Sequence, residues 1–200
     1  MIKKIMGKII IVIIYLFVST IYSQTSSDYD KLGSEMDQAR NYRCAIKNYE
    51  KALQLDPNNI PILEKLFFAK CNYSKDKGAL DVISKLITLH PESSKFYFLK
   101  AATHSKLKNY SAAINDYTQA INKQENKISD FTIYSERGLC KFRLKDYKGA
   151  LADFNQTLSV YPNPGVLKYK NEAESQIKER ESQIKYRAIP VSAQHIYLHK

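Results

Sequence analysis

Histidine is the residue type in this sequence that comes nearest to a metal-binding pattern. His195 and His199 are four residues apart, so on a helix they would share one face and could bind a metal ion. Protein metal sites normally need three or four ligands, and the other two histidines, His90 and His104, stand far away in the sequence. We therefore expect neither a metal site nor a cofactor.

The three cysteines, Cys44, Cys71 and Cys140, form no CxxC motif. Cys44 and Cys71 belong to adjoining predicted helices and could approach each other, a question that the sequence leaves open. Small apolar roles are favoured for all three thiols. A glycine-rich phosphate loop and a nucleophile elbow are also absent from the sequence. We therefore predict no catalytic residues and no enzyme activity, with an enzyme of unrecognised type as the remote alternative.

The N-terminal residues have the pattern of a targeting segment. Lys3, Lys4 and Lys8 precede the apolar run 9–18, and a more polar stretch of small residues follows up to Ser23. This order is typical of a signal peptide, which predicts that residues 1–23 are removed and that the protein is periplasmic or secreted. The apolar run is shorter than the roughly 20 residues of a membrane span. Retention of residues 9–22 as a membrane anchor is the alternative.

Composition and repeated spacing favour a helical protein. Six Gly and six Pro in 200 residues are few for a turn-rich all-β fold. Ala45, Ala79 and Ala113 are 34 residues apart, Ala150 follows 37 later, and similar phrases surround each alanine. A proline follows three of these alanines after twelve residues, where it would end a helix (Pro57, Pro91 and Pro162). The period predicts stacked helix pairs.

The residue types at matching places in the repeats each have a structural role. Small residues of the first helix would let the second helix approach closely, at Gly33, Ala101 and Gly138. Aromatic residues of the second helix would fill the space between neighbouring pairs, at Tyr49, Tyr117 and Phe154. Side-chain oxygens would cap the second helix, at Asn41, Asn109 and Asp146. The second copy departs from this pattern through Phe67, Lys75 and Ile83, and its helices are expected to lie farther apart.

This pattern resembles the tetratricopeptide repeat, in which an aromatic, a Leu-Gly pair, alanines, a further aromatic and a proline recur over 34 residues. The resemblance implies an all-α fold, a right-handed α-solenoid of four helix pairs at 26–59, 60–93, 94–127 and 131–164, and a longer polar connection within 122–130. Residues 165–187 are predicted to form a C-terminal capping helix with one apolar stripe, and 188–200 a loose tail. A coiled-coil partner helix is the alternative for 165–187.

In proteins that resemble this one, the first helices of the pairs line a concave surface that binds a peptide or a partner helix. The resemblance places on that surface Asp30, Ser34, Asp37, Glu64, Phe68, Cys71, Asn72, Phe98, Ala102, Ser105, Lys106, Ser135, Leu139, Phe142 and Arg143. The alternative for the aromatic members is packing between repeats. The basic clamp of chaperone-binding relatives is not matched, because Asp30 and Ser34 stand where Lys and Asn are expected.

The charge pattern bears on the partner. Lys and Arg number 31 against 20 Asp and Glu, a formal charge of +11, and residues 94–200 carry eighteen bases and ten acids. A basic surface of this kind suits an anionic partner or serves only to keep the protein soluble. Nucleic acid is disfavoured because no recognition motif is present. The sequence thus predicts an exported scaffold that binds a protein or peptide, with a membrane contact only if residues 1–23 are retained.

Overall fold

The computed structural model describes residues 24–123 and 130–187, and within these ranges every regular element is an α-helix. The predicted signal peptide, the centre of the connection before the fourth repeat, and the tail with His195 and His199 lie outside the described residues. No described helix is both long enough and apolar enough to cross a membrane. The chain divides into two compact units between Val82 and Ile83, and each unit is described by itself.

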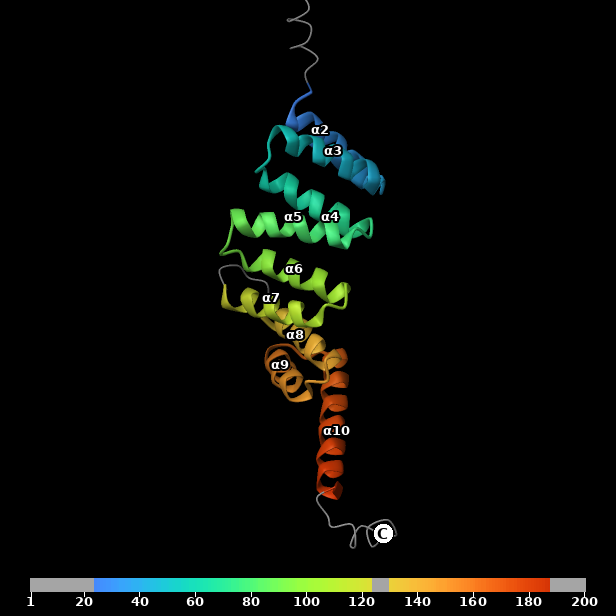
Figure 1. The fold of residues 1–200 in the computed structure, drawn as a ribbon, viewed down its shortest axis with the longest axis vertical. Coiled ribbons are helices and arrows are strands. Elements are labelled where there is room, and N and C mark those ends of the chain that lie inside the picture. The colour runs from blue at the N-terminus through green and yellow to red at the C-terminus, as the bar shows by residue number, and fades with distance from the viewer. Residues whose placement is uncertain (1–23, 124–129, 188–200) are drawn as a thin grey trace, which may run out of the picture. The chain divides into compact units, whose positions relative to one another are not determined.

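From residue 24 on, the first unit has three complete helices and the first half of a fourth (Figure 1). The helix α2 packs against α3, and α3 packs in turn against α4. The helices are α2 (Ser26–Gln38), α3 (Tyr42–Leu55), α4 (Ile60–Asn72) and α5 (Asp76–Leu89), and the unit boundary falls within α5.

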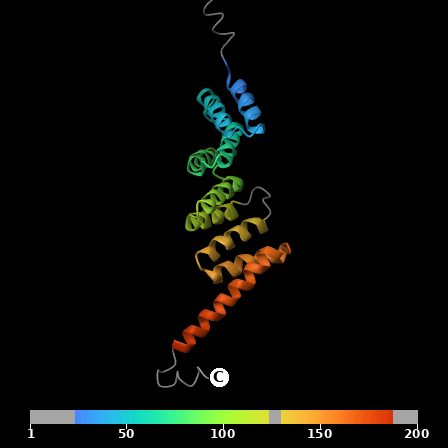
Figure 2. The same cartoon turned by 90° about the vertical axis from the view of Figure 1, so that its right-hand side faces the viewer.

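The second unit continues the pairing of helices and adds a long C-terminal helix. Each helix from α6 to α9 packs against the next one, up to α10. Figure 2 shows that α10 runs well past the neighbouring helix α9. The helices are α6 (Ser94–Lys106), α7 (Tyr110–Asn122), α8 (Asp130–Arg143), α9 (Tyr147–Val160) and α10 (Pro164–Arg187).

The turn inside every helix pair has the same backbone conformation. One residue of each turn has a positive φ, a conformation that costs energy for a side chain other than glycine, and these residues are Arg40, Ser74, Lys108 and Lys145. In three pairs the next residue is the N-cap of the second helix. Asn41 accepts a hydrogen bond from the Cys44 amide, and Asp146 accepts one from the Gly149 amide. Asn109 occupies the same place without a capping side-chain bond, and nothing in the structure explains this difference from the prediction.

The predicted small residues lie directly under the predicted aromatic rings. A Cβ atom added to Gly33 would come within 2.5 Å of the Tyr49 ring, and one added to Gly138 would come within 2.7 Å of the Phe154 ring. The aromatic rings therefore fill space inside their own pairs as well as between neighbouring pairs. Close approach of the two helices explains why glycine is needed at these two places.

A second contact inside the pair joins the start of the first helix to the last turn of the second. The hydroxyl of Ser26 donates to the Ala52 carbonyl at 3.0 Å, and that of Ser94 donates to the Ala120 carbonyl at 2.7 Å. In the fourth pair the direction is reversed, since the Thr157 hydroxyl donates to the Phe131 carbonyl at 3.1 Å. All three bonds span 26 residues, so they occupy one place in the repeat.

The predicted apolar stripe of α10 is buried only over its first half. Val166 and Ala173 are buried, Tyr169 and Ile177 are half-buried, and Ile184 is 68% exposed. Because α10 packs on α9 and α8, its first half covers the last helix pair, as a capping helix must. The second half presents its apolar residues to solvent.

Candidate protein-binding surface

The predicted surface residues of the first unit lie on α2 and α4 and are joined by a lysine. The Lys65 ammonium on α4 lies 2.8 Å from the Asp30 carboxylate and 3.2 Å from the Ser34 hydroxyl, both on α2. The Tyr49 hydroxyl also donates to the Ser34 hydroxyl at 3.5 Å, and burial raises the pKa of Tyr49. This part of the surface is therefore an acid–base pair flanked by the half-buried acids Asp37 and Glu64.

The C-terminal half of α4 supplies an exposed aromatic side chain. Phe68 is 44% exposed, and its ring meets that of buried Phe67 edge-on, with the centroids 5.2 Å apart. Cys71 is half-buried beside it and Asn72 is exposed. The large residue that departs from the repeat pattern, Phe67, therefore supports an exposed aromatic residue on the predicted surface.

In the second unit, the predicted residues of α6 are more closely involved in packing. The Phe98 ring lies 5.8 Å from the ring of buried Tyr117 on α7. The Cys140 thiol donates to the Ser105 hydroxyl at 3.5 Å, which connects α8 to α6. Ala102 is half-buried and Lys106 is exposed.

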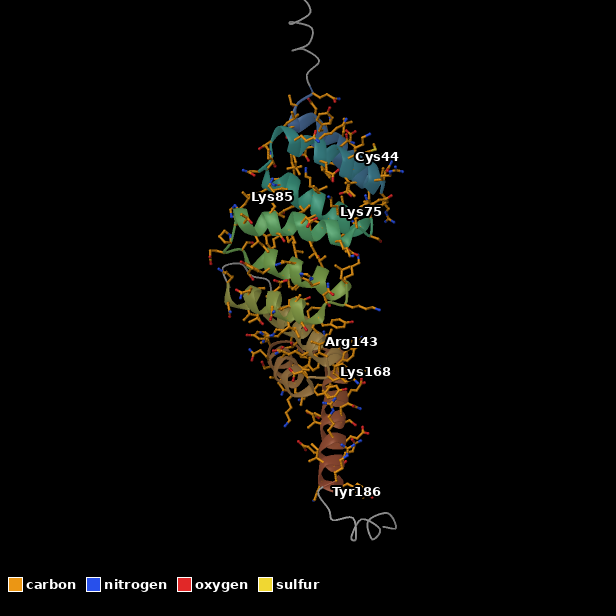
Figure 3. The ribbon with its side chains drawn as sticks, in the orientation of Figure 1. Cys44, Lys75, Lys85, Arg143, Lys168 and Tyr186 are labelled. Carbon is orange, nitrogen blue, oxygen red and sulfur yellow. The ribbon has the colours of Figure 1, made fainter. Side chains whose placement is uncertain are left out.

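The predicted residues of α8 contribute to the core of the fourth pair. Leu139 and Phe142 pack against the buried cluster of Ala150, Phe154 and Val166. The Phe142 ring also meets the rings of Tyr147 and Tyr169 at 5.3 and 5.4 Å. Ser135 donates to the carbonyl of Thr132 within its own helix, and Arg143 is exposed at the end of α8 (Figure 3).

All of the predicted surface residues keep some access to solvent, since each of them is half-buried or exposed. Residues beside them on the same helices are buried, including Gly33, Phe67, Ala101 and Cys140. The first helices therefore have one buried face and one accessible face, on which the predicted residues lie. The sequence missed Lys65, although its spacing offered a signal: Asp30–Lys65 and Ser105–Cys140 are both 35 residues apart, one more than the period.

Two cations of α8 form salt bridges with a buried acid of α9. Asp153 is 4% exposed and pairs with Arg137 at 2.7 Å and with Lys141 at 2.8 Å. The same two positions in repeat 3 are Lys100 and His104, which lie 3.4 and 3.7 Å from Asp116. Contacts of this kind join the two helices in repeats 3 and 4.

Thiol chemistry is not favoured at Cys140, the buried cysteine. Burial raises the pKa of Cys140, which disfavours the nucleophilic thiolate. No disulfide joins Cys44, Cys71 or Cys140, all three of which lie in the described ranges. Within residues 24–123 and 130–187, no three His, Cys, Asp or Glu side chains are grouped as metal ligands would be. The accessible faces of the first helices carry hydrogen-bonding groups, charges and aromatic rings, which are groups that can contact a ligand.

Comparisons with known proteins agree with this fold. The family model "Tetratricopeptide repeat" matches residues 29–59 and 94–126. Human tetratricopeptide repeat protein 13 is 30% identical over 139 residues, which are 64% of this chain and 15% of that protein. The chain therefore spans less than a third of the length of the curated relatives it matches.

Solved structures of the same fold are also similar. A tetratricopeptide repeat protein from Parabacteroides merdae has a TM-score of 0.69 and 18% identity, over 82% of this chain and 65% of that one. The protein YrrB, a TPR protein with an unusual peptide-binding site, has a TM-score of 0.66 and 17% identity, over 84% of this chain and 85% of that one. The predicted all-α solenoid fold is thereby confirmed, and so is the predicted resemblance to the tetratricopeptide repeat, whose family model matches two segments of the chain.

Proposed function

We propose that this protein is a non-catalytic scaffold that binds a peptide or a partner protein on the accessible faces of the first helices. The observation that carries the proposal is that every predicted surface residue keeps solvent access while other residues of the same helices are buried. Tetratricopeptide repeats suit protein–protein interaction, and the similar protein YrrB has a peptide-binding site. Exposed Phe68 and Arg143 are of side-chain types that are enriched at protein interfaces.

We also propose that the scaffold works outside the cytoplasm. The support is the order of charged, apolar and small residues in 1–23, which suits a cleaved signal peptide and a periplasmic or secreted protein. Retention of the segment would make the same scaffold membrane-anchored. Mass spectrometry of the mature N-terminus separates the two: a first residue of Gln24 supports cleaved export, and an intact Met1 contradicts it.

A quantitative pull-down from the native host tests the binding proposal. We expect Phe68→Ala and Arg143→Glu each to reduce the recovery of a shared partner at least fivefold. Leu55→Ala and Lys168→Glu are the matched controls, because both residues are exposed, Leu55 lies on a second helix and Lys168 on α10. Circular dichroism checks that all four variants keep their helix content. Equal partner recovery by all four variants would overturn the proposal.

A further inference from the structure

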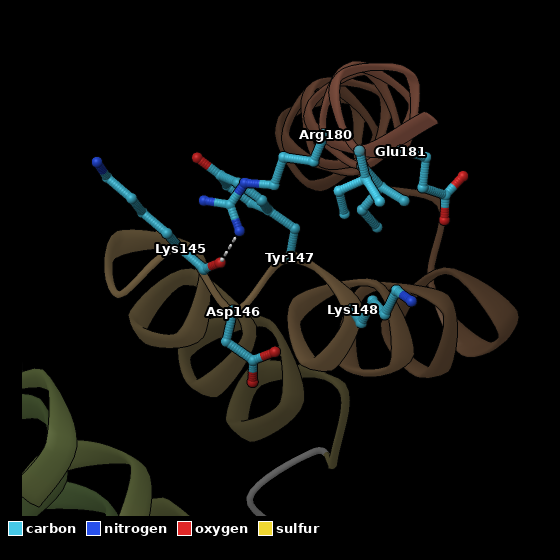
Figure 4. A pocket seen from close by; sticks show the side chains of 8 residues that line it. Lys145, Asp146, Tyr147, Lys148, Arg180 and Glu181 are labelled. Atoms are coloured by element: carbon cyan, nitrogen blue, oxygen red, sulfur yellow. Dashed lines mark hydrogen bonds between the residues drawn. The ribbon is translucent and has the colours of Figure 1, made fainter. Parts of the chain in front are cut away.

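A pocket outside the predicted surface lies between α10 and the turn that joins α8 to α9 (Figure 4). Its volume is about 270 Å³, and its apolar lining comes from Tyr147, Ile177 and Ile184. Cofactor and drug-sized sites span roughly 300–1,000 Å³. This pocket is smaller, and it therefore suits one or two amino-acid side chains better than a whole small molecule.

Three of the side chains that line the pocket are held by contacts with other residues. The Arg180 guanidinium donates to the Lys145 carbonyl at 3.3 Å and lies 4.6 Å from the centre of the Tyr147 ring, as Figure 4 shows. Tyr147 is buried and meets the ring of Phe142 edge-on. Asp146 accepts from the Gly149 amide and so fixes the start of α9. These three side chains are thus positioned without a ligand, which reduces the entropy lost on binding.

Two features of the pocket indicate the chemistry of its occupant. Ile184 is 68% exposed at its edge and would bury apolar area against a side chain placed in the pocket. Three cations, Lys145, Lys148 and Arg180, line it against two acids. Of these acids, Asp146 accepts a hydrogen bond from the Gly149 amide, and the lining still has one more cation than acids.

We propose that this pocket is a second binding site, which takes an apolar side chain of an acidic peptide segment. The apolar side chain would lie between Tyr147, Ile177 and Ile184. Carboxylates on either side of it would approach Lys145 and Lys148, because the three cations of the lining outnumber its two acids. This site lies on the α8–α9 turn and α10, and none of its lining residues belongs to the surface of the proposed function. The two proposals are therefore tested independently.

The test measures binding of three fluorescein-labelled peptides to the full chain by fluorescence anisotropy. The first peptide has one leucine with two aspartates on each side, the second replaces leucine by serine, and the third replaces the aspartates by lysines. We expect the first peptide to bind at least fivefold more tightly than the other two. Ile184→Glu and Lys148→Glu should each weaken its binding at least fivefold, because one removes apolar area and both add negative charge.

Matched controls make the result specific. Val160→Glu changes an apolar residue that is 64% exposed on α9 but outside the pocket, and Lys168→Glu changes an exposed lysine of α10 outside it. Both should bind the first peptide as the unchanged chain does. No binding, equal binding of the leucine and serine peptides, or equal weakening by the controls would overturn the proposal. So would sedimentation showing that Ile184→Glu dissociates a dimer while the peptide does not bind, since the occupant would then be a second copy.

Discussion

Repeat 1 and repeat 4 place a glycine of the first helix under an aromatic ring of the second, yet the residues beside that contact differ in charge. In repeat 4, Asp153 is buried between Arg137 and Lys141. In repeat 1 the residue at the place of Asp153 is Asn48, which donates to the Cys44 carbonyl of its own helix. Leu32 and Met36 of repeat 1 stand at the places of Arg137 and Lys141.

The difference shows which part of the repeat pattern is fixed by packing. The glycine and the aromatic ring are needed in both pairs because the helices approach closely there. The neighbouring layer accepts either apolar residues or a paired acid. A buried salt bridge adds little net stability compared with apolar residues of similar size, but losing one partner is costly. Repeat 4 is therefore more sensitive than repeat 1 to single substitutions in this layer.

Removing the buried acid should have the largest effect. Asp153→Ala leaves Arg137 and Lys141 partly buried without their partner, which costs about 3–5 kcal/mol of unfolding free energy. Asn48→Ala at the matching place should cost less than about 1 kcal/mol, because Asn48 makes one exposed hydrogen bond. Urea denaturation followed by circular dichroism measures both. Equal losses in the two variants would mean that the charged layer does not distinguish the repeats.

Adding a methyl group under the aromatic rings should affect both repeats alike. Gly33→Ala and Gly138→Ala each place a Cβ atom less than 3 Å from an aromatic ring, and such overpacking costs about 1–3 kcal/mol. Gly78→Ala is the control, because its Cβ atom would meet only the Lys70 side chain, at 3.7 Å. It should stabilise helix α5 by about 0.5–1 kcal/mol. Thermal and urea denaturation give both signs, and a neutral Gly138→Ala would contradict close helix contact in repeat 4.

Removing the hydroxyl contact at the end of a helix pair should also cost repeat 4 more unfolding free energy than repeat 1, but the difference should be smaller. Thr157→Val removes a buried donor to the Phe131 carbonyl with almost no change of shape, at a cost of about 1 kcal/mol. Ser26→Ala in repeat 1 removes a part-buried bond and should cost about 0.5 kcal/mol. Urea midpoints measured side by side decide the order. A larger loss for Ser26→Ala would show that burial does not set the value of this contact.

The repeat, its glycine–aromatic contact and two of the three side-chain caps could be predicted from the sequence, because each depends on residues at fixed spacing. The Asp153 salt bridges could not, since repeat 1 lacks all three residue types at those places and repeat 2 has only the lysine, Lys70. The surface prediction named the accessible side chains but missed Lys65, whose contact with Asp30 depends on how α4 lies beside α2. Likewise, no pattern in the sequence indicates that Arg180 reaches back to the α8–α9 turn.

The stability of repeats 1 and 4 should depend differently on pH at one matching position. Glu136 in repeat 4 is partly buried and this burial raises its pKa, while the matching residue of repeat 1 is the exposed Lys31. An acid whose pKa is higher in the folded than in the unfolded chain binds its proton more tightly when folded. Its contribution to stability is therefore greatest below its usual pKa of 4.5 and falls as pH rises from there to the folded-state pKa.

Glu136→Gln removes this loss of stability, because glutamine keeps the shape of glutamate without its charge. The variant should match the unchanged chain at about pH 4 and exceed it at pH 7, as measured by urea denaturation at several pH values. Lys31→Gln should leave the shape of the pH profile unchanged in this range, because it neither adds nor removes a buried acid. If Glu136→Gln instead lowers stability at pH 7, the ionised carboxylate has a favourable partner in the folded chain and is not penalised by burial.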